Sequence, residues 1–91
     1  MHTHTKKLLF DILRACLEVE RFTAGITLSE YSASTMRRAA TERMFEIMGE
    51  AMTRLRDTDR EIFMRVPGAH GIIGFRNRLI HGYDAVDDEI V

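Results

Sequence analysis

The residues most able to do chemistry lie together near the end of the chain, in the segment 76–83, which reads RNRLIHGY. An arginine can hold a phosphate with a planar fork of N–H donors, and a histidine can move a proton near neutral pH. Together they are sufficient for one reaction, the attack of an RNA 2′-hydroxyl on its own 3′-phosphate. His81 would transfer the proton, and Arg76 would stabilise the charge that grows on the phosphoryl oxygens. RNA carries the nucleophile itself, so this reaction needs no metal and no cofactor.

The spacing of these residues leaves two interpretations open. On an ideal helix Asn77 and His81 share a face because they lie four residues apart, whereas Arg76 and His81 point about 140° away from each other. Arg76 and His81 therefore converge more easily if the helix ends near His81, or if two copies of the chain meet. In the alternative interpretation, Arg76 and Arg78 are surface charges and His81 caps a helix.

Composition and charge limit the class of protein. The chain has 91 residues, of which 45% are hydrophobic and 30% are charged, and this predicts one small globular domain. The net charge of −1 predicts no general attraction to polyanions, so binding to nucleic acid would require a local cluster of cations. Cys16 is the single cysteine, which fits a reducing cytoplasm. No stretch is long and apolar enough to span a membrane, so we expect a cytoplasmic protein.

Helical spacing of the apolar residues predicts an all-α fold, specifically a small antiparallel helical bundle. The domain is expected to cover residues 6–91, after a disordered lead-in at residues 1–5. Its three main helices are expected near residues 6–22, 35–56 and 69–81.

The first of these helices carries a clear apolar stripe, made of Leu8, Ile12, Val19 and Phe22. Leu9, Leu13 and Leu17 are expected to widen this stripe. Cys16 lies within it, and we interpret it as a small core residue rather than a nucleophile.

Shorter elements connect the main helices. Gly25 is expected to stop the first helix, and residues 27–34 are expected to form a linker with at most one helical turn. Residues 57–65 predict a short helix, and Pro67-Gly68 predicts a turn. Gly82 is expected to end the last complete helix.

The predicted helix at 35–56 carries two apolar stripes, one for the chain's own core and one spare. The first consists of Met36, Ala40, Met44, Ile47, Ala51 and Leu55, and the second of Phe45, Met48 and Met52. Gly49 lies mid-helix, where glycine costs roughly 1 kcal/mol relative to alanine, so another helix is expected to approach closely there. Together these features predict a homodimer. Glu46 and Glu50 lie four residues apart on one edge, and their spacing alone indicates a solvated face.

Taken together, these motifs resemble the HepT-like branch of the HEPN superfamily. Arg76, His81 and Tyr83 follow its R-x-x-x-x-H-x-Y signature. Residues 46–51 resemble its second-helix block, usually I-G-E-A after a glutamate, and residues 73–83 resemble its helix-to-loop block. The resemblance covers nearly the whole chain from about Lys6. Family members normally continue with a further helix after the block that resembles 86–91, so the final helix of this chain looks truncated.

The resemblance implies a fold, an activity and partners. Such proteins are α-helical bundles that dimerise with two motifs facing each other, and they are toxins of type II toxin–antitoxin modules. They are metal-independent endoribonucleases, which implies that Arg76 and His81 are catalytic here. We assign a supporting role to Asn77 and an RNA-phosphate contact to Arg78. The family's partner is a nucleotidyltransferase antitoxin of the MNT type, which implies AMP addition at Tyr83.

An alternative of a different class is a non-catalytic HEPN-type module. Such a module would use the same helical dimer to bind a nucleotide or a partner protein. Metal-free cleavage of RNA, lost in His81→Ala, would distinguish the two.

Overall fold

The fold consists of helices joined by short connections. A computed structural model describes residues 3–81, with side chains for residues 3–79. Its elements are α1 (Thr3–Thr23), α2 (Leu28–Ala33), α3 (Thr35–Thr58), α4 (Arg60–Arg65) and α5 (Ala69–His81). The described residues contain no strand, so the prediction of an all-α fold is confirmed. No helix within residues 3–81 is both long and apolar enough to cross a membrane.

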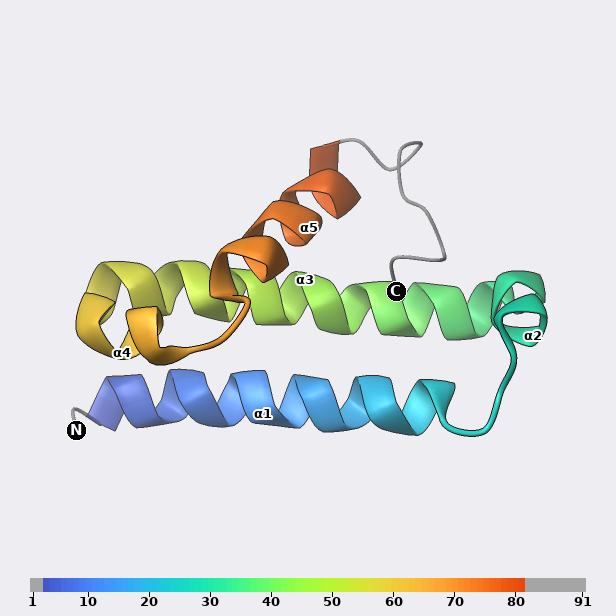
Figure 1. Ribbon diagram of the computed structural model, residues 1–91, viewed down its shortest axis with the longest axis horizontal. Coiled ribbons are helices and arrows are strands. Elements are labelled where there is room, and N and C mark those ends of the chain that lie inside the picture. The colour runs from blue at the N-terminus through green and yellow to red at the C-terminus, as the bar shows by residue number, and fades with distance from the viewer. Residues whose placement is uncertain (1–2, 82–91) are drawn as a thin grey trace.

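The long helices α1 and α3 lie side by side and run in opposite directions, as Figure 1 shows. On the other edge of α3, α5 packs across it at an oblique angle (Figure 1). The helix α3 is therefore the central element, with α1 on one flank and α5 on the other.

The three main helices lie where the apolar spacing predicts them, with one difference at the start. α1 begins at Thr3 rather than near Lys6, so Thr5 is helical and not part of a disordered lead-in. Thr5 is fully buried, and its hydroxyl donates a hydrogen bond of 3.4 Å to Asp59 Oδ2. A partner 54 residues away in the sequence thus stabilises the first turn of α1.

Local caps set the ends of the shorter elements. Thr27 and Glu30 form a capping box, so the expected linker contains the six-residue helix α2. Ser34 accepts a hydrogen bond from the Arg37 backbone N–H and begins α3. Past the end of α1, Gly25 has a φ of 70°, which fits the expected helix stop. Gly68 has a φ of 74° in the predicted turn before α5.

The core lies between α3 and the helices around it. It consists of Leu8, Ile12, Ala51, Met52, Leu55, Phe63, Ala69 and Ile73. Phe63 of α4 and Leu55 of α3 are completely buried, so the short helix α4 closes one end of the bundle.

The apolar stripes differ from expectation in two ways. The second stripe of α3 is not spare, because Met48 and Met52 are buried within this chain and the ring of Phe45 packs against Phe75 of α5. In α1, Leu13 and Leu17 do not widen the core-facing stripe. They lie more than half exposed on the opposite side of the helix, together with Phe10. Among the described residues, three exposed large apolar side chains therefore share one face of α1, whereas α3 exposes Met36 near its start.

Candidate functional site

The contact between α3 and α5 is built around Gly49. A Cβ atom added at Gly49 would overlap with Cβ and Cγ of Arg76. The expected close approach at Gly49 is therefore confirmed, but the approaching helix is α5 of the same chain. Glycine at this position lets the stem of Arg76 lie directly on the backbone of α3.

An aromatic pair one turn from Gly49 fixes the same contact. The rings of Phe45 and Phe75 lie 5.1 Å apart between centroids and meet edge to face at 86°. This is a favoured geometry for aromatic pairs. Because Phe75 precedes Arg76 in α5, the pair also fixes the rotation of the helix that carries the arginine.

The guanidinium of Arg76 has two neighbours at its terminal nitrogens. Nη1 donates a hydrogen bond of 3.1 Å to Oδ1 of Asn77, and Nη2 lies 3.6 Å from Oε2 of Glu50. Nε is buried and has no hydrogen-bond partner among the described residues. The side chain as a whole is 24% exposed, so the terminal nitrogens are its route to a ligand.

Glu50 connects Arg76 to a second arginine. Its Oε1 accepts a hydrogen bond of 3.0 Å from Nη2 of Arg54, while its Oε2 faces Arg76. The side chain of Glu50 is 52% exposed, yet it is not simply a solvated charge. Glu46, one turn earlier, is 31% exposed and pairs with Arg43 at 3.2 Å.

The other predicted site residues are placed to different extents. Asn77 and Arg78 are exposed on α5, and Arg78 has no ion-pair partner within the described part of the chain. His81 is the last residue of α5, and its side chain lies outside what is described. Tyr83 lies beyond the described residues, as do Gly82 and the expected start of a further helix. The structure brings Arg76 and Asn77 together and leaves the approach of His81 untested.

Sequence reasoning missed the role of Glu50 beside Arg76. The pattern contained a usable indication, because Glu50 directly follows Gly49, where a close approach was expected. The missing information was the identity of the approaching residue, which comes from α5.

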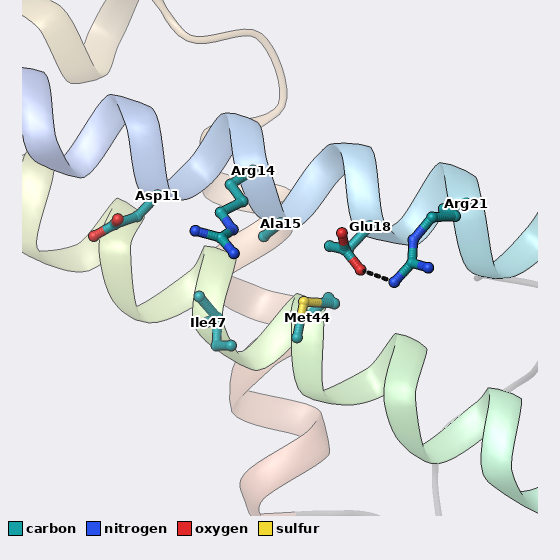
Figure 2. A pocket seen from close by; sticks show the side chains of 7 residues that line it. All are labelled: Asp11, Arg14, Ala15, Glu18, Arg21, Met44 and Ile47. Atoms are coloured by element: carbon teal, nitrogen blue, oxygen red, sulfur yellow. Dashed lines mark hydrogen bonds and ion pairs between the residues drawn. The ribbon is translucent and has the colours of Figure 1, made fainter.

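A groove lies between α1 and α3. One pocket, of about 430 Å³, is lined by Asp11, Arg14, Ala15, Glu18, Arg21, Met44 and Ile47. Figure 2 shows charged side chains of α1 above this pocket, with Glu18 and Arg21 paired to each other at 2.6 Å. A neighbouring pocket of about 440 Å³ includes Glu50 and Arg54. Most charges in this groove are paired with opposite charges, so it lacks the concentrated positive charge that a polyanion favours.

Residues 3–79 were also compared with the requirements of a metal site and of a nucleophilic thiol. No group of three or more metal-ligating side chains occurs there. Burial, and to a lesser degree the charge of Glu20, raises the pKa of the Cys16 thiol above its ordinary value of 9.0. Its Sγ lies 3.4 Å from Sδ of Met48. A protonated, partly buried thiol behaves as a core residue, which agrees with the interpretation from the sequence.

Comparison with known proteins places this geometry in context. The family described as "HepT-like: Ribonuclease HepT-like" matches residues 12–91. "Putative RNase MJ1380" of Methanocaldococcus jannaschii is 39% identical over 82 residues, covering 90% of this chain and 74% of that protein. "Putative RNase MJ1216" of the same organism is 30% identical over 82 residues, covering 90% and 67%. No solved structure matches the chain significantly.

Proposed function

This chain belongs to the HepT-like ribonuclease family, and from that premise we propose that it is a metal-independent endoribonuclease acting as the toxin of a type II toxin–antitoxin module. The observation that supports the proposal is the set of contacts that hold the Arg76 side chain. Its stem lies against Gly49, and its terminal nitrogens are oriented by Asn77 and Glu50.

The proposed reaction is an internal transfer at phosphorus. His81 takes the proton from the 2′-hydroxyl, and the 2′-oxygen forms a bond to the adjacent phosphorus. The bond from phosphorus to the 5′-oxygen breaks, and that oxygen takes a proton from water. Arg76 stabilises the negative charge on the phosphoryl oxygens through Nη1 and Nη2. The products are a 2′,3′-cyclic phosphate and a 5′-hydroxyl, so the nucleophile comes from the RNA itself and neither a water nucleophile nor a metal is needed.

The site is proposed to form in a homodimer. On an ideal helix, positions five residues apart lie about 140° from each other, so Arg76 and His81 of one chain are not expected to converge. A second copy brings its own motif close and lets an arginine of one copy work with a histidine of the other. The uncovered apolar face on α1 (Phe10, Leu13 and Leu17) is consistent with a chain that associates, since such patches mark interaction surfaces.

The partner is proposed to be an MNT-type nucleotidyltransferase that adds AMP to Tyr83. Tyr83 lies two residues beyond His81 and seven beyond Arg76. A phosphodiester attached there brings a negative charge near the arginines that would hold RNA. It would pair with Arg76 or Arg78 in place of the substrate.

Cleavage of a labelled RNA in the presence of a chelator tests the proposal. The purified chain is expected to produce fragments that end in cyclic phosphate, and Arg76→Lys is expected to lose most of this activity. Arg65→Ala is a matched control, because Arg65 is an exposed arginine of α4 that pairs only with Glu61 among the described residues. Binding of RNA or a nucleotide without cleavage would support the non-catalytic module instead.

A further inference from the structure

We propose that Glu50 is a positioning residue for Arg76, which sets the direction in which the guanidinium presents its N–H groups to an RNA phosphate. This inference rests on the proposed function of Arg76. It concerns a residue of α3 that lies outside the segment 76–83 and takes no part in proton transfer.

The first argument is that Arg76 is held at both ends. Its Cβ and Cγ lie against the backbone at Gly49, which fixes the stem. Its Nη2 faces Glu50 Oε2 at 3.6 Å, which restrains the tip. Gly49 and Glu50 are adjacent, so a single turn of α3 contacts the whole length of the side chain.

The second argument is that only part of the guanidinium is available. Nε is buried, so a phosphate reaches Arg76 through Nη1 and Nη2. Nη1 donates one of its hydrogens to Asn77 Oδ1, and Glu50 Oε2 lies on one side of Nη2. Each terminal nitrogen carries two hydrogens, so each keeps one N–H that neither Asn77 nor Glu50 uses and that a phosphate oxygen can accept.

The third argument is that Glu50 is itself held in place. Arg54 donates to Oε1 at 3.0 Å, a normal hydrogen-bond distance, whereas the 3.6 Å contact to Arg76 is a looser charge–charge interaction. Glu50 is therefore bound more firmly to Arg54 than to Arg76. One carboxylate between two guanidinium groups leaves a net positive charge, so the cluster Arg54–Glu50–Arg76 still attracts a phosphate.

Because Glu50 is half exposed, its effect on the position of Arg76 can be measured apart from any effect on folding stability. An ion pair in which one side chain is half exposed contributes little to folding. The loss of Glu50 is therefore expected to change catalysis more than the melting temperature.

Steady-state RNA cleavage by Glu50→Gln tests the proposal. This variant keeps the shape of the side chain and removes its charge, and kcat is expected to fall about tenfold with KM within about twofold, as for an interaction used mainly in the transition state. Glu50→Asp keeps the charge and is expected to recover part of the loss. Glu46→Gln is the matched control, because Glu46 is an acid of the same helix that pairs with Arg43, and it is expected to behave like the parent chain.

Two kinetic results would overturn the proposal. A lower KM with unchanged or higher kcat in Glu50→Gln would identify Glu50 as an anion that competes with phosphate. An equal loss in Glu46→Gln would identify a general charge effect. If Glu50→Gln does not fold, Arg54→Gln decides, because it releases Glu50 without altering Arg76. A smaller loss of kcat is expected there, and no loss would contradict the proposal.

A second measurement does not depend on activity. The ¹⁵N relaxation of the Arg76 Nε–Hε group reports the order of the guanidinium, which is expected to decrease in Glu50→Gln and not in Glu46→Gln. If the parent chain cleaves no RNA, the proposed function fails, and this measurement alone decides the positioning. Unchanged order in Glu50→Gln would then refute it.

Discussion

Gly49 of α3 and Arg76 of α5 lie in direct contact, at a point where any side chain on residue 49 would overlap with the arginine. This one contact sets the distance between α3 and α5. It also sets the position of Arg76, the candidate catalytic cation.

Gly49→Ala is expected to separate activity from stability. Overlap in a packed contact costs about 1–3 kcal/mol, whereas alanine gains about 1 kcal/mol over glycine in a helix, so the free energy of unfolding should fall by at most about 2 kcal/mol. α5 must nevertheless move, and a shift of about 1 Å at a catalytic group can reduce a rate about a hundredfold. Urea unfolding and RNA cleavage measure the two effects.

Gly74→Ala is the control for this substitution. Gly74 lies in the same helix as Arg76, it is exposed, and a Cβ there meets no described atom within 4 Å. The alanine should stabilise the chain by about 0.5–1 kcal/mol and leave cleavage unchanged. If Gly49→Ala and Gly74→Ala cleave RNA equally well, the close contact has no part in activity.

Metal removal and alanine substitution should have opposite outcomes. Cleavage is expected to continue in excess chelator, because Arg76 and His81 supply the charge stabilisation and proton transfer. Arg76→Ala and His81→Ala should each abolish cleavage, and Asn77→Ala should cause a smaller loss, since Asn77 contacts Arg76 through one hydrogen bond. Loss of cleavage in chelator alone would overturn the mechanism.

Mixing two inactive variants tests whether the site is shared between copies. If an arginine of one copy works with a histidine of the other, a dimer of Arg76→Ala and His81→Ala contains one intact site. Random mixing gives half mixed dimers with one of two sites intact, so about a quarter of the parent activity should return. Each variant mixed only with itself should stay inactive. No recovery, with mixed dimers verified by native mass spectrometry, would place each site within a single chain.

Tyr83→Phe is expected to keep most of the cleavage activity and to escape silencing. Incubation with the cognate nucleotidyltransferase and ATP should add the mass of one AMP to the parent chain and stop cleavage, because the added phosphate competes for the arginines. Intact-mass spectrometry measures the modification. Full modification of Tyr83→Phe would place the acceptor elsewhere.

Cys16 should react slowly with a thiol reagent in the folded protein. Its raised pKa keeps the thiol protonated near pH 8, and the thiolate is the reactive form. A raised pKa in the folded state also means that the unfolded chain ionises first, so stability should fall as pH rises above 9.0. Cys16→Ala should remove this component of the pH dependence, as urea titrations at pH 7 and pH 10 would show.

The sequence predicts the elements better than their partners. Apolar spacing places the three main helices, because periodicity is a local property. Gly49 correctly indicates a close approach, but spacing cannot say whether the approaching helix belongs to this chain or to a second one. The partner of Glu50 cannot be predicted either. Its four-residue spacing from Glu46 indicates solvent exposure and carries no information about Arg76. Local patterns cannot place Thr5 within the first helix, because its partner, Asp59, is 54 residues away in the sequence.

Asp59 has a consequence for the order in which the chain assembles during synthesis. One of its carboxylate oxygens caps α4 by accepting from the Ile62 backbone N–H, and the other accepts from Thr5 in the first turn of α1. A ribosome makes α1 first, yet the hydroxyl of Thr5 in its first turn cannot donate to Asp59 until Asp59 emerges. Arg76 emerges later still, after the residues that support it on α3. On the proposed function, a nascent chain would therefore lack the RNA-cleaving site until residues 76–81 have been made.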